Sequence, residues 1–259
     1  MPHAQINNAQ IHYRFDGPEN APVLVFSNSL GSTLSMWDTQ VPALSKNFRI
    51  LRYDTRGHGQ SSVTPGPYSI EQLAKDVLDL LDFLHLDWVD FCGLSMGGAT
   101  GQWLGAHAPQ RLHKLILANT TAKFGTPDPW NTRIATVQKS GMKTVAPTVI
   151  ERWFTSSFRQ NHPASVETAQ QMLENANPEG YIANCAAVRD FDSREYLHSI
   201  RVPTLVIAGT HDPSTTPTEG QFLTQNVPGA RYIELPAAHL SNIEAQDQFN
   251  TALASFLSS

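Results

Sequence analysis

Residues 90–98 read Asp-Phe-Cys-Gly-Leu-Ser-Met-Gly-Gly, and this stretch decides the fold. The residues before it are apolar and β-favouring, which predicts a buried strand, and those after it predict a helix that Pro109 ends. Gly93 and Gly97 stand two residues before and two residues after Ser95, the G-x-S-x-G spacing of a nucleophile elbow. In such a turn the serine backbone is strained, and a Cβ at either glycine would clash where the chain doubles back. The stretch therefore predicts that Ser95 is a nucleophile.

A nucleophilic serine needs a base to accept its proton and an acid to orient that base. The candidate acid is Asp212, in a turn after the strand-like run 203–208, and the candidate base is His239, shortly after the strand-like run 230–235. Taken singly, an Asp before a proline is a common turn residue, and a loop histidine is commonly a solvated side chain. His211 is an alternative base, but it shares a tight turn with Asp212 and is badly placed to face that carboxylate. The order serine, acid, histidine along the chain favours Asp212 and His239.

Acyl chemistry at a serine also needs two backbone N–H groups that stabilise the developing oxyanion. One predicted donor is the amide of Met96, the residue after the nucleophile. The second is the amide of Leu30, in the loop after the strand-like run 22–27, where Gly31 would allow a close backbone approach. The alternative interpretation of this loop is an ordinary strand-to-helix turn rich in serine and glycine.

Strand-like and helical runs alternate in the first half of the chain. In chain order they are strands near 5–6, 11–15 and 23–27, a helix at 36–46, a strand at 49–53, a helix with one apolar face at 70–84, the elbow, and a strand at 112–118. This alternation predicts an α/β fold with a mostly parallel central sheet covered by helices on both faces, after an antiparallel start. The polar loop 54–61 is expected to brace the site with structural rather than catalytic groups.

The alternation stops after Asn119 and resumes near Leu205. Between them, helical runs are predicted at 132–142, 145–156, 165–175 and 180–189, separated by prolines. We therefore expect residues 1–120 and 195–259 to form the core and residues 121–194 to form an inserted helical cap. Such a cap excludes water and supplies substrate contacts from outside the core.

Length and composition narrow the class of protein. A chain of 259 residues with 41% hydrophobic residues is long enough for one large α/β domain, and a net charge of −5 gives no footprint for nucleic acid. No apolar run is long enough to span a bilayer, and residues 1–5 lack the features of a secretory signal, so we expect a cytoplasmic protein without membrane association. The 2 cysteines, Cys92 and Cys185, form no disulfide framework. The sequence leaves the oligomeric state open.

The pattern of histidines and glycines argues against bound metals and cofactors. The 10 histidines are scattered, and none forms an H-E-x-x-H or comparable ligand pair. No phosphate-binding loop or dinucleotide fingerprint follows a strand. We expect no metal and no cofactor.

Several segments carry a resemblance to a known family: residues 28–31, 52–59, 93–98 and 208–213, and Ala-Ala-Val-Arg-Asp at 186–190. On these segments the whole chain resembles the α/β-hydrolase superfamily and, more narrowly, the 3-oxoadipate enol-lactonases of aromatic catabolism. Many relatives in the superfamily carry His-Gly where this chain has Asn28-Ser29, which favours the lactonases over generic esterases.

This resemblance implies a serine hydrolase that opens 3-oxoadipate enol-lactone to 3-oxoadipate in the β-ketoadipate pathway, without a cofactor. In the implied mechanism Ser95 attacks the lactone carbonyl, His239 accepts its proton, and Asp212 holds the imidazole in the required tautomer. The leaving group is an enolate that stays tethered to the acyl-enzyme. The implied partner is a small anionic lactone, a five-membered unsaturated ring with one acetate arm.

The carboxylate of that substrate needs a cation inside the capped pocket, because a protein of net negative charge gives no long-range attraction. Arg133 is the favoured cation, since arginine pairs carboxylates bidentately, and Trp130 or Trp153 would form an apolar wall. Arg189 is the alternative cation. Each of these arginines is equally compatible with a surface position on the cap.

Other functions use the same residues. A general carboxylesterase or cofactor-free perhydrolase would differ only in its pocket, and a carbon–carbon bond hydrolase of a ring-cleavage product is closely related. A non-catalytic ligand-binding protein of the same fold is the alternative of a different class, and the intact Ser95, Asp212 and His239 argue against it. A haloalkane dehalogenase is excluded, because it would need Asp in place of Ser95.

Overall fold

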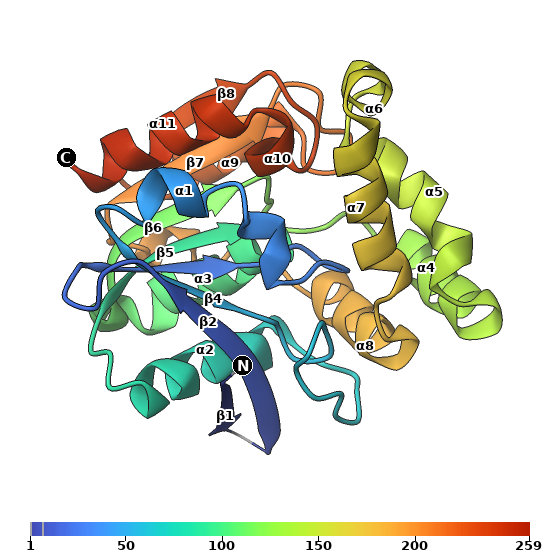
Figure 1. Cartoon of the computed structure of the whole chain (residues 1–259), viewed down its shortest axis with the longest axis horizontal. Helices are drawn as coiled ribbons and strands as arrows, with labels where there is room; N and C mark the ends of the chain where they lie inside the picture. Colours follow the sequence, from blue (N-terminus) through green and yellow to red (C-terminus); the bar gives the residue numbers. More distant parts are fainter. Residues whose placement is uncertain (1, 7) are drawn as a thin grey trace.

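The computed structural model describes residues 2–6 and 8–259, and this part of the chain is built on one eight-stranded sheet (Figure 1). Its strands are β1 (His3–Ile6), β2 (Ala9–Asp16), β3 (Val23–Ser27), β4 (Arg49–Tyr53), β5 (Val89–Leu94), β6 (Leu112–Ala118), β7 (Thr204–Gly209) and β8 (Arg231–Leu235). Their order across the sheet is β1-β2-β4-β3-β5-β6-β7-β8. The β1–β2 and β2–β4 pairs are antiparallel, and the pairs from β4 to β8 are parallel. The predicted mostly parallel sheet with an antiparallel start is confirmed.

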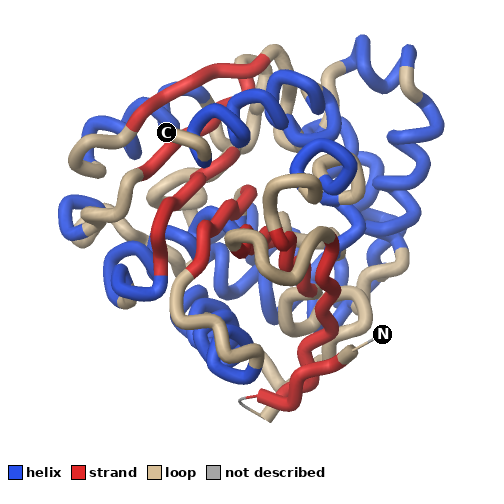
Figure 2. Tube along the Cα trace, turned by 60° about the vertical axis from the view of Figure 1, so that its left-hand side comes forward, coloured by secondary structure: helices blue, strands red, loops and turns tan. Residues whose placement is uncertain are grey.

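Helices cover both faces of this sheet, as Figure 2 shows with blue helices on either side of the red strands. The core helices are α1 (Val41–Leu44), α2 (Ile70–Phe83), α3 (Met96–His107), α9 (Pro217–Asn226), α10 (Ser241–Glu244) and α11 (Gln246–Leu257). Successive side chains of β3 point to opposite faces of the sheet and so enter two apolar clusters. Leu24 and Phe26 belong to the cluster that includes residues of α1 and α11, and Val25 belongs to the cluster that includes residues of α2 and α9. No helix among residues 2–6 and 8–259 combines the length and the apolar character needed to cross a bilayer.

Of the two helices predicted before residues 90–98, one is confirmed and one is wrong. The helix predicted at 70–84 is α2. Of its predicted apolar face, Leu73, Val77, Leu80 and Leu81 are buried, and Leu84 is the half-buried C-cap. The helix predicted at 36–46 is wrong. The chain there forms a short 3₁₀ helix at Leu34–Trp37 and then α1, which has Pro42 in its first turn. Proline has no N–H to donate, so it fits a helix start and not the interior of one long helix.

Between β6 and β7 the described chain forms five α-helices, which gather at one end of the molecule (Figure 1). They are α4 (Pro127–Ser140), α5 (Met142–Trp153), α6 (Ser156–Asn161), α7 (Pro163–Glu174) and α8 (Pro178–Arg189). The two ends of this insertion meet at an isolated antiparallel bridge between Lys123 and Asp192. We keep residues 121–194 as the proposed cap.

The boundaries of the cap helices differ from those predicted. Pro127, Pro163 and Pro178 are the first residues of α4, α7 and α8, and they do not separate the helices as predicted. The fixed φ of proline suits the first helical position, where its missing N–H would have had no partner in any case. The short helix α6 was not predicted, and the Thr155 side chain caps it by accepting the N–H of Phe158.

Candidate active site

Ser95 lies in the sharp turn between β5 and α3. Its backbone has φ 58° and ψ −111°, a positive-φ conformation that is strained for any residue with a side chain. A Cβ on Gly93 would lie 2.0 Å from the carbonyl oxygen of Gly97, and a Cβ on Gly97 would lie 2.2 Å from the carbonyl oxygen of Ser27. The predicted steric need for both glycines is therefore confirmed.

Asp212 and His239 meet in the loops that follow β7 and β8. Asp212 Oδ2 accepts hydrogen bonds from His239 Nδ1 at 2.8 Å, Thr215 Oγ1 at 2.6 Å and Asn119 Nδ2 at 3.0 Å, and its Oδ1 accepts the backbone N–H groups of Ser214 and Thr215. Burial raises the pKa of Asp212, but the His239 charge and the side-chain hydrogen bonds outweigh it, so the net pKa lies below its ordinary value. A carboxylate held in this way keeps a proton on His239 Nδ1 and leaves Nε2 as an acceptor.

Asn119 is a residue of this site that the sequence reasoning missed. It follows β6, has φ 43°, and besides Asp212 its carboxamide contacts the carbonyl of Ala238 at 3.2 Å and the hydroxyl of Ser241 at 2.5 Å. The available signal was its position directly after a buried parallel strand, at the same edge of the sheet as Ser95.

His211, the alternative base, lies away from these residues. Its side chain is exposed and lines a second hollow together with His162 and Glu244. His239 is 5% exposed and lines the same cavity as Ser95. Of the two histidines, only His239 is in a position to serve Ser95.

The loop after β3 includes a backbone amide, that of Leu30, which no described residue accepts. The N–H of Gly31 donates to His58 Nε2 at 2.8 Å, and the N–H of Ser29 points to the sulfur of Met36 at 3.4 Å. Between them, the amide of Leu30 has no acceptor among the described residues, and Leu30 lines the cavity. Gly31 has φ 81° and packs against the cap, so the absence of a side chain here serves contact with the cap and not the predicted close approach of a ligand.

The amide of Met96 is the second predicted donor. Met96 is the first residue of α3, where helix N–H groups lack intrahelical partners, and within the described chain its amide has no acceptor. The next amide, of Gly97, is used instead to hold the loop after β3, because it donates to the carbonyl of Asn28 at 3.0 Å. This bond ties the start of α3 to the loop that carries Leu30.

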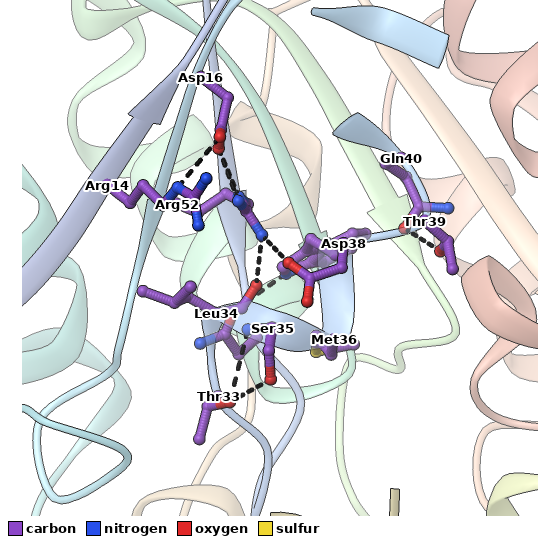
Figure 3. A network of polar contacts seen from close by, with 12 residues as sticks. Arg14, Asp16, Thr33, Leu34, Ser35, Met36, Asp38, Thr39, Gln40 and Arg52 are labelled. Atoms are coloured by element: carbon purple, nitrogen blue, oxygen red, sulfur yellow. Dashed lines mark hydrogen bonds and ion pairs between the residues drawn. The ribbon is translucent and has the colours of Figure 1, made fainter. Parts of the chain in front are cut away.

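A buried arginine on β4 fixes the far end of that loop (Figure 3). Arg52 donates to the carbonyl of Leu34 at 3.3 Å, to Asp38 at 2.5 Å, and to Asp16 at 2.6 Å and 2.9 Å. The N–H of Leu34 donates to Asp54 Oδ1 at 2.8 Å. The loop is thus held from both its N–H and its C=O side by groups of the neighbouring strand and of the loop that follows it.

His58 completes this support and belongs to the predicted bracing loop 54–61. Its Nε2 accepts the N–H of Gly31, so in the neutral ring Nδ1 carries the proton, and the Asn184 carboxamide lies 3.3 Å from Nδ1. Burial lowers the pKa of His58 to about 4, despite the hydrogen bond to Arg56 and the nearby Asp54. His58 is therefore a neutral structural group, as predicted for this loop.

A cavity of about 490 Å³ lies between the core and the cap helices and is lined by Ser95. Its core side includes Ser29, Leu30, Ser95, Pro213, Ser214, Thr215, Glu219 and His239, and its cap side includes Phe124, Pro129, Trp130, Arg133, Val149, Arg152, Trp153 and Tyr181. The predicted cap residues Arg133, Trp130 and Trp153 thus all line the cavity. In the part of the chain that the structure describes, no three His, Cys, Asp or Glu side chains converge as a metal site.

Two cations face this cavity. The guanidinium of Arg133 lies 4.7 Å from the ring centre of Trp130. Arg152 was not predicted; burial and the nearby charge of Arg133 lower its pKa. Neither arginine has a carboxylate within ion-pair distance among residues 2–6 and 8–259. The signal for Arg152 was present, because Val149, Arg152 and Trp153 lie on one helical face.

Arg189, the alternative cation, is not part of the cavity lining. Its guanidinium pairs with both oxygens of Asp190, each at 2.7 Å, and donates to Asn131 at 2.9 Å. The side chain is thus already engaged on the outside of the cap. The expectation that Arg189 faces the substrate is corrected by this placement.

Comparison with known proteins gives consistent matches over nearly the whole chain. A family model described as alpha/beta hydrolase fold matches residues 22–246. The chain is 43% identical to 3-oxoadipate enol-lactonase 2 of Acinetobacter baylyi, over 94% of this chain and 91% of that protein. It is 41% identical to 3-oxoadipate enol-lactonase 1 of the same organism, over 95% of this chain and 92% of that protein.

A protein of comparable sequence identity to this chain is found among the solved structures. The crystal structure of the enol-lactonase from Burkholderia xenovorans superposes with a TM-score of 0.98 at 46% identity, and the match covers 100% of both chains. A likeness of this extent includes the cap helices as well as the sheet, so it is a likeness of the whole architecture.

Proposed function

The chain belongs to the α/β-hydrolase family, and on that basis we propose that it is a lactonase that opens 3-oxoadipate enol-lactone to 3-oxoadipate. The proposal draws its substrate from the relatives named as enol-lactonases. The observation that carries it is the cavity that joins Ser95 and His239 to the guanidinium groups of Arg133 and Arg152, for which the described residues offer no carboxylate within ion-pair distance. An anionic ester is the class of substrate that uses all four groups.

In the proposed reaction Ser95 Oγ attacks the lactone carbonyl, and His239 Nε2 accepts the hydroxyl proton. Asp212 keeps the imidazole in the tautomer with the proton on Nδ1, and its lowered pKa maintains its charge while His239 becomes cationic. The amides of Leu30 and Met96 would donate to the oxyanion. Because both amides are held by the surrounding loop and helix before substrate binds, they need no reorganisation when the charge develops.

Collapse of the tetrahedral intermediate expels an enolate that remains tethered to the acyl-enzyme. A tethered nucleophile of this kind can have an effective molarity of about 10⁵ M or more, so it would re-close the ring in competition with water. Protonation of the enolate to the ketone removes that nucleophile and commits the acyl-enzyme to hydrolysis. A trapped acyl-enzyme that deacylates while still in the enol form would contradict this order of steps.

The acetate arm of the substrate would lie against Arg133, with Arg152 beside it. Trp130 stacks on the guanidinium of Arg133, so the cation is held in place before a ligand binds. Trp153, which is 3% exposed, supplies an apolar wall for the ring. Partial burial strengthens a charge-assisted hydrogen bond to the carboxylate relative to one in water.

The test is the steady-state kcat/KM of the wild-type chain for 3-oxoadipate enol-lactone and for a neutral nitrophenyl ester of similar size, with Ser95→Ala as control. The proposal predicts a strong preference for the lactone, and loss of both activities in the variant. A preference for the neutral ester would keep Ser95 as nucleophile but assign a general carboxylesterase. Absence of turnover of either compound by the wild type would favour a non-catalytic binding protein.

A further inference from the structure

One segment of the cap is hydrogen bonded directly to the loop that carries His239. The backbone N–H of His239 donates to the carbonyl of Arg152 at 3.4 Å, and the N–H of Leu240 donates to the carbonyl of Trp153 at 3.0 Å. The same two cap residues line the cavity. The end of α5 therefore contacts both the substrate space and the backbone of the candidate base.

Glu244, the last residue of α10, extends this contact on both sides. Its carboxylate accepts the N–H of Ala238 at 2.9 Å, the N–H of Thr155 at 3.2 Å and 3.3 Å, and the hydroxyl of Thr155. Thr155 Oγ1 in turn accepts the N–H of Phe158 at 3.2 Å and so caps α6. Ala238 immediately precedes His239, and Thr155 follows Trp153 by two residues.

Glu244 reaches these groups without entering the active cavity. It lines the second hollow, of about 510 Å³, together with Thr155 and His211, and it is absent from the lining of the cavity around Ser95. Any effect of Glu244 on the reaction must therefore pass through the two segments that it joins. Both segments end in groups that the proposed reaction uses.

We propose that Glu244 is a positioning residue that joins the cap segment 152–155 to the loop 238–240. Through this junction the arginine and tryptophan that hold the substrate and the histidine that accepts the proton adopt one common geometry. The inference deepens the proposed function and rests on it for the roles of Arg152 and His239.

The chemistry at this junction requires a carboxylate. Two oxygens with several lone pairs serve three donors, and an ionised acceptor makes stronger hydrogen bonds than a neutral one. In Glu244→Gln the amide NH₂ would replace one oxygen and would face a donor, so at least one of the bonds to Ala238 or Thr155 would be lost. Because a displacement of about 1 Å far from the reacting atoms can lower a rate about 100-fold, loosening His239 is expected to be visible in kcat.

The experiment compares the full-length chain with Glu244→Gln and with the matched control Glu151→Gln. Glu151 is a cap carboxylate whose side chain is 66% exposed and lies 3.8 Å from Arg159. Active sites are first counted by titration with a serine-reactive fluorophosphonate, so that kcat refers only to folded, reactive enzyme. We expect kcat per active site for the enol-lactone to fall about 10- to 100-fold in Glu244→Gln, with a raised KM, and to stay unchanged in Glu151→Gln.

A second readout separates positioning from general destabilisation and does not need the lactone. The downfield proton resonance of the His239–Asp212 hydrogen bond, followed by NMR, is expected to shift or broaden in Glu244→Gln and to stay unchanged in Glu151→Gln. If Glu244→Gln does not fold, Thr155→Val removes one donor of the junction and should give the same changes with a smaller, about 3- to 10-fold, loss of kcat.

An unchanged resonance together with a wild-type kcat per active site would overturn the inference. A loss explained entirely by a smaller number of titratable active sites would overturn it as well. Failure of the proposed function has a different signature: the wild-type chain would not turn over the lactone, while the resonance comparison would still decide the role of Glu244.

Discussion

The core and the cap hold their polar side chains in opposite ways. In the core, the polar groups near Ser95 have their hydrogen-bonding capacity largely used: the carboxylate of Asp212 accepts bonds from four residues, and Arg52 donates to three. In the cap, Arg133 and Arg152 face the cavity, and neither is paired with a carboxylate in the part of the chain that the structure describes.

We propose that this difference separates reaction from recognition. A group whose bonds are satisfied within the protein has a fixed position before substrate arrives, which is what transition-state stabilisation requires. A cation whose donors are not used by the protein keeps them for a ligand, which is what recognition of an anion requires. Changes in the core should therefore reduce kcat for every ester, and removal of the cap cations that face the cavity should raise KM for anionic substrates alone.

Replacement of Ser95 should have the largest effect. Ser95→Ala removes the proposed nucleophile but leaves the cavity intact, so we expect kcat to fall by about 10⁵- to 10⁶-fold for the lactone and for a neutral ester alike. Steady-state kinetics on both substrates, with the lactone KM or binding constant as a check on the cavity, measure the effect. A loss confined to one of the two substrates would contradict the division between core and cap.

Asp212→Asn should have the next largest effect. The carboxamide keeps the size of the side chain but no longer fixes the proton on His239 Nδ1, so kcat should fall about 10⁴-fold on both substrates with little change in KM. The measurement is kcat across pH with circular dichroism as a check on folding. A decrease smaller than about 10-fold would show that another group orients His239.

His58 tests the core side of the comparison, through the pH dependence of the free energy of unfolding. Its folded pKa, about 4, lies below the ordinary value of 6.5, so the unfolded chain binds a proton that the folded chain does not between these two values. His58 should thus lower the free energy of unfolding by about 3 kcal/mol as the pH falls from 6.5 to 4, and should have no such effect above 7.

The variant His58→Gln keeps an acceptor for the N–H of Gly31 but cannot titrate. Urea unfolding at several pH values should therefore show a shallower loss of stability between pH 6.5 and 4 in this variant than in the wild type. Equal slopes in the two proteins would mean that His58 is charged in the folded chain.

Arg133→Ala should have the smallest of these effects and the most selective one. Loss of a charge-assisted hydrogen bond to a carboxylate costs about 1.5–3 kcal/mol, so KM for the lactone should rise about 10- to 100-fold while kinetics on the neutral ester stay within about 2-fold. Arg189→Ala is the matched control, because Arg189 is already paired with Asp190 on the outside of the cap. An equal loss on both substrates would assign Arg133 a structural role.

The sequence predicted the parts of the site that depend on local chain geometry. Ser95 follows from the two glycines of its turn, and Asp212 and His239 follow from loops placed directly after buried strands. Parallel strands bring such loops to one edge of a sheet, so their distance along the chain does not matter. The same reasoning predicted the apolar face of α2 and the structural role of loop 54–61.

The residues that were missed or misplaced depend on how separate elements pack. Glu244 and the backbone carbonyl of Arg152 acquire their contacts only when α5 lies against the loop after β8, and no short pattern encodes that packing. Arg189 and Arg133 are both arginines in helices of the cap, and only the neighbouring Asp190 and the orientation of α8 distinguish the two. The helix starts at Pro127, Pro163 and Pro178 were recoverable, since proline favours the first helical position.

The central claim, that the core performs the reaction and the cap selects the anion, is tested most directly by one ratio. It is kcat/KM for the enol-lactone divided by kcat/KM for a neutral ester of similar size, measured in the wild type and in the double variant Arg133→Met, Arg152→Met. We predict that the ratio falls at least about 100-fold while kcat/KM for the neutral ester is retained, because two cations are lost from the cavity and no core group is touched. An unchanged ratio, or an equal fall of both kcat/KM values, would contradict the claim.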